Sequence, residues 1–219
     1  MPATLFFDLD GTLTDPFEGI TGSVRFALER LGAEVPEAQE LAWCIGPPLA
    51  DTFSRLLPED RVPDAIAAYR ERFGRVGLFE NAPYPGIHDS LEALRLAGFE
   101  LCIASSKPHV YVGRILERFE LAAFFTRVFG SELDGTRTDK ADLLRFALDE
   151  TGCAAEEATM IGDRRHDIVG AIANDVAHVG VLYGYGSAEE LREAGARRLA
   201  RDPAELVAIL TGAPAPRNP

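Results

Sequence analysis

The sequence is poor in cysteine, with only three in 219 residues, and they lie far apart at Cys44, Cys102 and Cys153. An odd number of cysteines without CxxC spacing favours neither a disulfide framework nor a zinc site. Free thiols are typical of a reducing compartment, so we expect a cytoplasmic protein.

Long apolar runs are absent as well, and no stretch approaches the roughly 20 apolar residues that a membrane-spanning helix requires. The first residues, MPATLFFDLDG, have no basic region and reach an acid at Asp8, so they do not resemble a signal peptide. We therefore expect a soluble protein without a membrane partner.

Positive charge is scarce, because 22 lysines and arginines stand against 35 aspartates and glutamates and give a formal net charge of −13. Binding of a nucleic-acid backbone needs clustered basic residues, and the sequence has no such cluster. The charge pattern therefore argues against a nucleic-acid partner. It does not exclude a small phosphorylated metabolite, because local cations, helix N-termini and a bound metal can overcome the long-range field.

Apolar residues are abundant, and at 47% of the chain they suffice for a core without disulfides or a structural metal. The segment Thr4–Leu9 (TLFFDL) predicts a buried strand that ends at a polar, glycine-containing cluster. From Ile20 to about Gly77 the apolar residues recur at helical spacing, with breaks at glycine and proline. This second segment is expected to be all helical.

After Pro83–Gly86 the pattern changes to alternating strands and helices. Strands are predicted at Glu100–Ala104, Arg127–Phe129, Ala158–Ile161 and Ala177–Leu182, and helices at Ile87–Ala97, Val110–Phe119, Lys140–Glu150, Asp167–Asn174, Ala188–Ala194 and Pro203–Leu210. Such alternation predicts an α/β fold, a doubly wound parallel sheet of the Rossmann-like type. We expect a catalytic core of residues 1–15 and 83–212, an inserted all-helical domain of residues 16–82, and a flexible tail of residues 213–219.

Ligands of such sheets bind beyond the carboxyl ends of the strands, so the polar residues that follow each predicted strand are candidates for a site. These residues are Asp8, Asp10, Gly11, Thr12 and Thr14 after the first strand, Ser105, Ser106 and Lys107 after the second, Lys140 a loop beyond the third, and Gly162, Asp163 and Asp167 after the fourth. Their types suit the transfer of a phosphoryl group.

Asp8 and Asp10 can divide the work, since one carboxylate can attack phosphorus while the other carries a proton to the leaving oxygen. Carboxylates repel a phosphate dianion, so this arrangement requires a hard divalent cation. Mg²⁺ is the expected cofactor, and Asp8 and Asp163 are candidate ligands. Asp167 would orient a metal-bound water or Lys140.

The negative charge of the phosphoryl oxygens needs donors and a cation as well. Lys140 would neutralise charge on these oxygens or on the nucleophile. Hydrogen bonds would come from the Ser105 hydroxyl and from backbone N–H groups in the segments Gly11–Thr12 and around Ser106.

The motifs FFDLDGTLTD, IASSKP, a distant Lys140 and MIGDRRHDI occur in the order of the four motifs of the haloacid dehalogenase superfamily, which the chain resembles over essentially its whole length. It looks similar to the phosphoglycolate phosphatase and 5′-nucleotidase-like members, in which a helical cap is inserted after the first motif. The resemblance implies that Asp8 is the nucleophile, Asp10 the general acid/base and a metal ligand through its backbone carbonyl, Ser105 the phosphate-binding hydroxyl, Lys140 the lysine of the third motif, and Asp163 with Asp167 the acidic fourth motif.

Some assignments stay open. Lys107 competes with Lys140 for the role of the main catalytic lysine, and Lys140 also suits a solvated charge at the start of a helix. The basic run Arg164–His166 suits a phosphate contact and an exposed turn equally well. Departures from the phosphoglycolate phosphatase pattern, Ser-Ser-Lys for Thr-Asn-Lys and Arg164 for Ser, remove no catalytic group but weaken any inference about the ester.

We therefore expect an Mg²⁺-dependent phosphomonoester hydrolase that acts through an aspartyl-phosphate on a phosphoglycolate-like metabolite or a nucleoside monophosphate. A phosphomutase acting on a sugar phosphate is the nearest alternative, since it would share all four motifs. A protein that binds a phosphorylated metabolite without turnover is the alternative of another class. A monomer and a homodimer are both compatible with the sequence.

Overall fold

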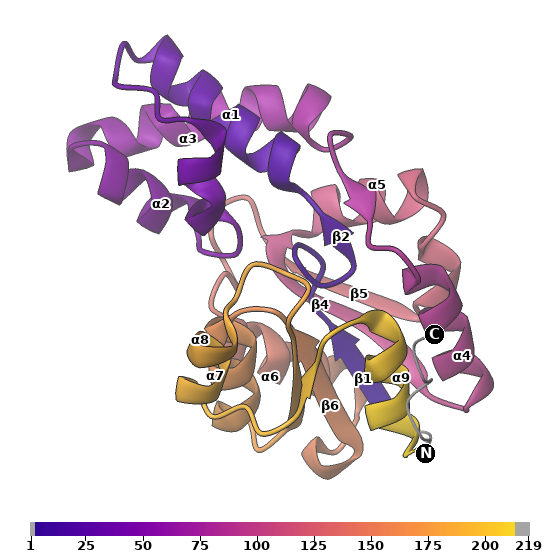
Figure 1. Cartoon of the computed structure of the whole chain (residues 1–219). Helices are drawn as coiled ribbons and strands as arrows, with labels where there is room; N and C mark the ends of the chain where they lie inside the picture. The colour runs from indigo at the N-terminus through magenta and orange to yellow at the C-terminus, as the bar shows by residue number, and fades with distance from the viewer. Residues whose placement is uncertain (1–2, 213–219) are drawn as a thin grey trace. The chain divides into compact units, whose positions relative to one another are not determined.

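The computed structural model describes residues 3–212, and its central feature is a parallel sheet of six strands (Figure 1). The order of the strands across the sheet is β5-β4-β1-β6-β7-β8. They are β1 (Thr4–Phe7), β4 (Glu100–Pro108), β5 (Arg127–Ser131), β6 (Ala158–Gly162), β7 (Ala177–Val181) and β8 (Leu199–Ala200). The predicted doubly wound parallel sheet is confirmed.

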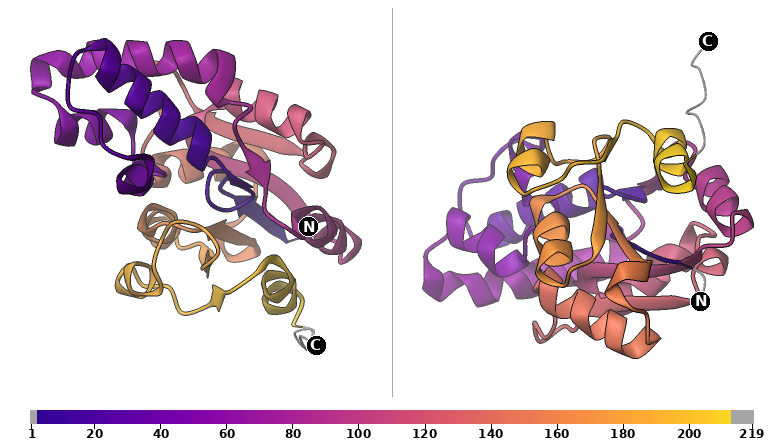
Figure 2. Two further views of the ribbon diagram at one scale, coloured as in Figure 1. Left: turned by 45° about the horizontal axis from the view of Figure 1, so that its top comes forward. Right: turned by 90° about the horizontal axis from the view of Figure 1, so that it is seen from below.

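Helices cover both faces of this sheet (Figures 1 and 2). On one face α6 contacts α7, and on the other α4 contacts α9. The helices are α4 (Ile87–Leu96), α5 (His109–Arg118), η4 (Ala122–Phe124), α6 (Lys140–Thr151), η5 (Ala155–Glu157), α7 (Arg165–Ala173), α8 (Ala188–Glu193) and α9 (Pro203–Thr211).

The strand order fixes where a ligand can bind. From β1 the chain proceeds in one direction to β4 and β5, and then returns to the other side of β1 to form β6, β7 and β8. This is the order of a dinucleotide-binding fold, in which the crevice at the carboxyl ends lies where the direction reverses. In this chain the reversal lies between β1 and β6, so the residues that follow these two strands face the same crevice.

β1 lies in the core of the α/β unit. All four residues of β1 are buried, because the strand has neighbours on both sides and helices on both faces. Phe6 pairs in register with Cys102 of β4 and with Met160 of β6, and these three side chains share one face of the sheet. There they form a buried cluster with α6 and α7, through residues such as Leu144 and Ala171.

The described residues divide into two compact units, one of residues 3–14 and 83–212 and the other of residues 15–82. Two short strands, β2 (Thr14–Asp15) and β3 (Ala82–Pro83), pair with each other and include the residues at which the chain passes from one unit to the other.

Between these strands the regular elements are helices. They are α1 (Phe17–Arg30), η1 (Ala38–Cys44), α2 (Leu49–Leu56), η2 (Glu59–Arg61), α3 (Val62–Arg72) and η3 (Phe73–Gly77). A close approach joins α1 to η3, since a Cβ atom on Gly19 would lie 2.1 Å from the carbonyl oxygen of Gly77. Stacked rings of Tyr69 and Phe73, with centroids 5.3 Å apart, add to this small core.

Several elements differ from the sequence prediction by one or more residues, and three of these differences concern the sheet or the site. β4 continues to Pro108, so Ser105 and Ser106 lie within the strand rather than after it. The register of β4 against β5 shifts between Ser105 and Pro108. α7 begins at Arg165 instead of Asp167, because the Asp167 carboxylate accepts the backbone N–H of Arg164 and stabilises an earlier start. β8 was not predicted, because two residues in a charged segment carry no periodic signal.

Among residues 3–212, no helix combines the length and the apolarity needed to cross a membrane. The cysteines at 44, 102 and 153 are all free. The tail predicted for residues 213–219 lies outside the described residues.

Phe6→Ala should destabilise the sheet by about 3–5 kcal/mol, because it removes a side chain with no exposed surface from the centre of the core. Urea unfolding followed by far-UV circular dichroism measures the change. Leu96→Ala is the control, since Leu96 is 79% exposed and its truncation should change stability by less than about 0.5 kcal/mol. Equal unfolding midpoints for the two variants would contradict the central place of Phe6.

Candidate active site

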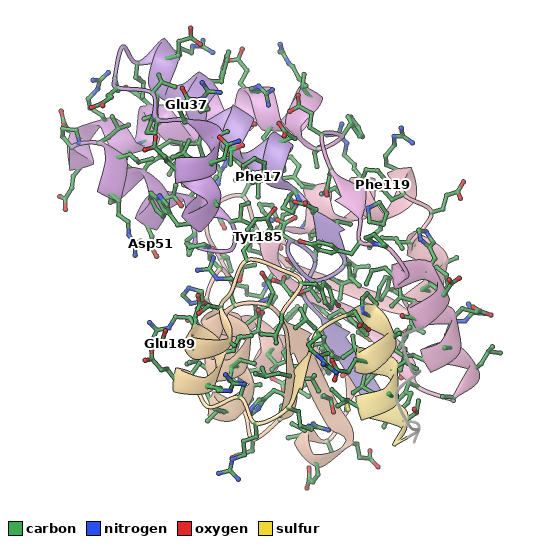
Figure 3. The ribbon with its side chains drawn as sticks, in the orientation of Figure 1. Phe17, Glu37, Asp51, Phe119, Tyr185 and Glu189 are labelled. Atoms are coloured by element: carbon green, nitrogen blue, oxygen red, sulfur yellow. The ribbon has the colours of Figure 1, made fainter. Side chains whose placement is uncertain are left out.

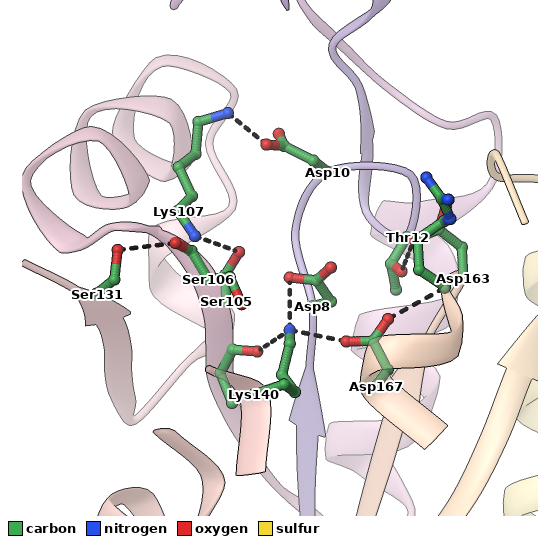
Figure 4. A network of polar contacts seen from close by, with 12 residues as sticks. Asp8, Asp10, Thr12, Ser105, Ser106, Lys107, Ser131, Lys140, Asp163 and Asp167 are labelled. Carbon is green, nitrogen blue, oxygen red and sulfur yellow. Dashed lines mark hydrogen bonds and ion pairs between the residues drawn. The ribbon is translucent and has the colours of Figure 1, made fainter. Parts of the chain in front are cut away.

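Four charged side chains gather at the carboxyl edge of the sheet (Figure 4). Asp8 follows β1, Asp163 follows β6, Asp167 lies in the first turn of α7, and Lys140 is the first residue of α6. All four are buried, with exposed fractions between 0% and 7%. Charged groups are rarely buried unless they are paired, so this edge is built for charge rather than for packing.

Lys140 is held by three oxygens. Its Nζ atom donates a hydrogen bond to the carbonyl oxygen of Ala104 at 2.9 Å and lies 3.1 Å from Oδ1 of Asp8 and 2.7 Å from Oδ1 of Asp167. Burial alone would lower the pKa of Lys140, but the charges of Asp167 and Asp8 outweigh it and raise that pKa. Lys140 is therefore a permanent cation, and it touches the predicted nucleophile.

Asp8, Asp163 and Asp167 each bring one carboxylate oxygen within 4.8 Å of the other two. Burial raises the pKa of Asp163 well above its ordinary value, and the charges of Asp167 and Asp8 raise it further. Burial also raises the pKa of Asp167, to about 6, although the charge of Lys140 opposes the shift. Repulsion between carboxylates thus adds to the cost of burying Asp163 and Asp167.

This donor set fits a hard divalent cation. With three carboxylates against one ammonium group, the cluster carries an excess of two negative charges when fully ionised. Oδ1 of Asp8 and Oδ1 of Asp167 are buried and contact the ammonium group of Lys140 at 3.1 Å and 2.7 Å, which leaves lone pairs on both carboxylates for a cation. Carboxylate oxygens with unused lone pairs are the ligands that Mg²⁺ prefers.

Asp163 is oriented by groups from two other segments. Its Oδ1 accepts a hydrogen bond from the Thr12 hydroxyl at 3.4 Å, and its Oδ2 accepts one from the backbone N–H of Tyr185 at 2.8 Å. Gly11 packs directly against it with φ of +81°, and a Cβ atom there would lie 2.2 Å from Oδ2. Only glycine combines this backbone conformation with this close approach.

Asp10 lies apart from that cluster and pairs with the other lysine. Its Oδ2 accepts a hydrogen bond from Nζ of Lys107, while its Oδ1 is buried and accepts none (Figure 4). Burial raises the pKa of Asp10, against the lowering effect of Lys107. The structure therefore gives the two candidate lysines different partners, Lys140 at Asp8 and Lys107 at Asp10.

Ser105 and Ser106 lie where the register of β4 shifts. Ser105 is buried, and its hydroxyl accepts a long hydrogen bond of 3.4 Å from the backbone N–H of Lys107. The carbonyl oxygen of Ser106 accepts a bond from the Ser131 hydroxyl at 2.7 Å, which fixes the end of β4 against β5. The serine pair thus lies at the same edge as Asp8, on the side toward β5.

The basic run Arg164–His166 is not a free patch. Nε of Arg164 donates to Oε1 of Glu190 at 2.9 Å, and burial with nearby cations lowers the pKa of His166. Tyr185 and Glu190 were missed by the sequence reasoning, although the segment Gly184–Gly186 also follows a strand of the sheet. That position was the signal that could have identified the loop.

The chain matches the haloacid dehalogenase-like hydrolase family over residues 5–181. The chain belongs to this family. The predicted membership is therefore confirmed, and it agrees with the order of acidic and basic residues along the carboxyl edge of the sheet.

Known members support the same assignment. A 5′-nucleotidase of Pseudomonas aeruginosa is 51% identical over 190 residues, which cover 86% of each chain. The tyrosine-protein kinase PtkA of Mycobacterium tuberculosis is 39% identical over 86% of this chain and 65% of its own length. The crystal structure of a predicted phosphatase from Clostridium acetobutylicum superposes with a TM-score of 0.93 at 40% identity, over 97% of this chain and 99% of that one. The expected enzyme class, a phosphatase of this family, is confirmed.

Gly11→Ala should reduce the hydrolysis of p-nitrophenyl phosphate by about 100-fold, because the new methyl group would displace the Asp163 carboxylate. Gly98→Ala is the matched control, since Gly98 also has a positive φ, +89°, but no atom lies within 4 Å of the added Cβ. In both variants, alanine in a left-handed backbone conformation should lower the free energy of unfolding by about 1–2 kcal/mol. Equal activities would show that Asp163 tolerates the displacement.

Proposed function

We propose that this chain is an Mg²⁺-dependent phosphomonoester hydrolase that uses Asp8 as its nucleophile. The observation that carries the proposal is the position of Asp8 at the end of β1, with Nζ of Lys140 3.1 Å from its Oδ1 and two more buried carboxylates beside it. The ammonium group of Lys140 holds the Asp8 carboxylate in place and offsets the repulsion between this carboxylate and the phosphate that it attacks.

In the first step, an Asp8 oxygen attacks phosphorus and the bond from phosphorus to the ester oxygen breaks. Asp10 gives its proton to the departing oxygen, so the products are the free alcohol and an aspartyl-phosphate. The raised pKa of Asp10 favours this role, because a buried carboxyl keeps a proton more readily than an exposed one. Lys107 would then stabilise the carboxylate that remains.

In the second step, Asp10 takes a proton from water as the water oxygen attacks phosphorus. The bond between phosphorus and Asp8 breaks, which releases inorganic phosphate and restores both aspartates. The Ser105 hydroxyl and the backbone N–H groups of the Gly11–Thr12 and Ser106 segments would hold the phosphoryl oxygens in both steps.

The carboxylates of Asp8 and Asp163 and the backbone carbonyl of Asp10 would hold Mg²⁺, with Asp167 orienting Lys140 from 2.7 Å. When bound, the cation supplies positive charge that offsets the repulsion between the carboxylates and a phosphate dianion. Lys140 would contribute to the same offset through its contact with Asp8.

For the substrate we favour a nucleoside 5′-monophosphate over a phosphoglycolate-like acid. The support is the 51% identity to a 5′-nucleotidase over most of both chains. Residues 16–82 would act as a cap that excludes water during the reaction.

Asp8→Asn should abolish turnover, with a loss of at least about 1000-fold, because an amide oxygen is a poor nucleophile and cannot form the aspartyl-phosphate. Phosphate release from p-nitrophenyl phosphate with Mg²⁺ measures the effect, and EDTA should stop the wild-type enzyme equally. Asp15→Asn is the control, since Asp15 lies outside the cluster. Retained turnover in Asp8→Asn would overturn the proposed nucleophile.

A substrate screen tests the ester. Initial rates of phosphate release should be compared at equal concentrations of nucleoside 5′-monophosphates, phosphoglycolate and sugar phosphates. We expect the highest kcat/KM with a nucleoside 5′-monophosphate. A higher value for phosphoglycolate would reverse the order of substrates, and a sugar bisphosphate formed during turnover would favour a phosphomutase instead.

A further inference from the structure

The segment from β7 into α8 surrounds the turn that carries Asp163. The segment contributes two anchors, the loop Gly184–Gly186 and the side chain of Glu190 on α8. Figure 3 shows the side chains of this region, with Tyr185 in the loop and Glu189 on α8 labelled.

The loop anchor acts on Asp163 directly. The backbone N–H of Tyr185 donates to Oδ2 of Asp163 at 2.8 Å. On either side the backbone has no space for a side chain, because a Cβ atom on Gly186 would lie 1.9 Å from the carbonyl oxygen of Asp163 and one on Gly184 would lie 2.1 Å from that of Gly11. The loop is therefore pressed against both Asp163 and the segment that follows β1.

The Glu190 anchor acts on Arg164 and Arg165, the two residues that follow Asp163. A single oxygen, Oε1, accepts hydrogen bonds from Nε of Arg164 and from the backbone N–H of Arg165, both at 2.9 Å. Arg165 begins α7, so its N–H has no acceptor within that helix. A carboxylate at this point also interacts favourably with the helix dipole.

The two anchors are linked to each other. Ser187 ends the loop and caps α8, since its hydroxyl accepts the backbone N–H of Glu190 at 3.0 Å. Glu190 therefore holds the two residues that follow Asp163, and the backbone N–H of Tyr185 holds the Asp163 carboxylate. Both groups belong to one short segment. An isolated surface ion pair would restrain the arginine alone.

We propose that Glu190 is a positioning residue, which sets the orientation of Asp163 through the start of α7 and thereby the affinity of the acidic cluster for a divalent cation. This inference rests on the metal site of the proposed function. Groups that orient a metal ligand from outside commonly change metal affinity by about 10-fold to 100-fold when they are removed.

The experiment is calorimetric titration of Mg²⁺ into the full chain after removal of metal with EDTA. Glu190→Ala should raise the dissociation constant by about 10-fold. Glu190→Gln keeps an acceptor for Arg165 but loses the charge opposite Arg164, and should raise it by about threefold. Glu189→Gln is the matched control, because it removes the same charge from an exposed position on the same helix and should change the constant by less than about twofold.

A second readout separates positioning from simple stabilisation. For Glu190→Ala, the Mg²⁺ concentration that gives half-maximal phosphatase activity should rise with the dissociation constant, while kcat at saturating Mg²⁺ changes little. A lower melting temperature in EDTA with an unchanged dissociation constant would overturn the proposal and leave Glu190 a structural residue.

The outcomes also distinguish the proposed role of Glu190 from the proposed metal site on which it depends. If the wild-type chain binds no Mg²⁺, the proposed metal site is wrong and the role of Glu190 is wrong with it. If the wild type binds and both Glu190 variants bind equally well, only the positioning role is overturned. Should Glu190→Ala fail to fold, Glu190→Gln decides alone, and wild-type affinity in that variant overturns the proposal.

Discussion

The buried ammonium group of Lys140 is the contact around which the carboxyl edge of the sheet is organised. Removing a charge of this kind from water costs several kcal/mol, so its burial requires partners with good geometry. The chain supplies them from three different elements: Asp8 after β1, the carbonyl oxygen of Ala104 in β4, and Asp167 in α7. One side chain at the start of α6 thus joins both sides of the crevice at which the strand order reverses.

The same contact leaves the site short of positive charge. Lys140 neutralises one of three neighbouring carboxylates, and burial, together with repulsion between the carboxylates, raises the pKa of Asp163 and of Asp167. A site under this repulsion is stabilised by whatever cation it binds. The buried lysine and the metal that we propose for this site therefore have one physical origin, the crowding of acids at the end of a parallel sheet.

Much of this arrangement could be predicted, because parallel strands deliver their following residues to one edge. Asp8 and Asp163 were placed together on that ground alone, and the structure brings an oxygen of each within 4.8 Å of the other. The end of β4 and the start of α7 could not be predicted to the residue. The end of β4 depends on a register shift against β5, and the start of α7 depends on which backbone N–H the Asp167 carboxylate accepts. The contact of the Gly184–Gly186 loop with Asp163 could not be predicted, because a hydrogen bond made by a backbone N–H leaves no mark on the residue type.

The sequence by itself determined the types of chemical group and the edge at which they meet, because the order of strands and helices follows from local periodicity. Only the tertiary structure decided how those groups pair. Lys107 and Lys140 were both candidates for the main catalytic lysine. Packing placed Lys140 at Asp8 and Lys107 at Asp10, which lies 97 residues before Lys107 in the chain. The reach of a flexible side chain is set by the backbones that support it, and their spacing exists only once the sheet and its helices have assembled.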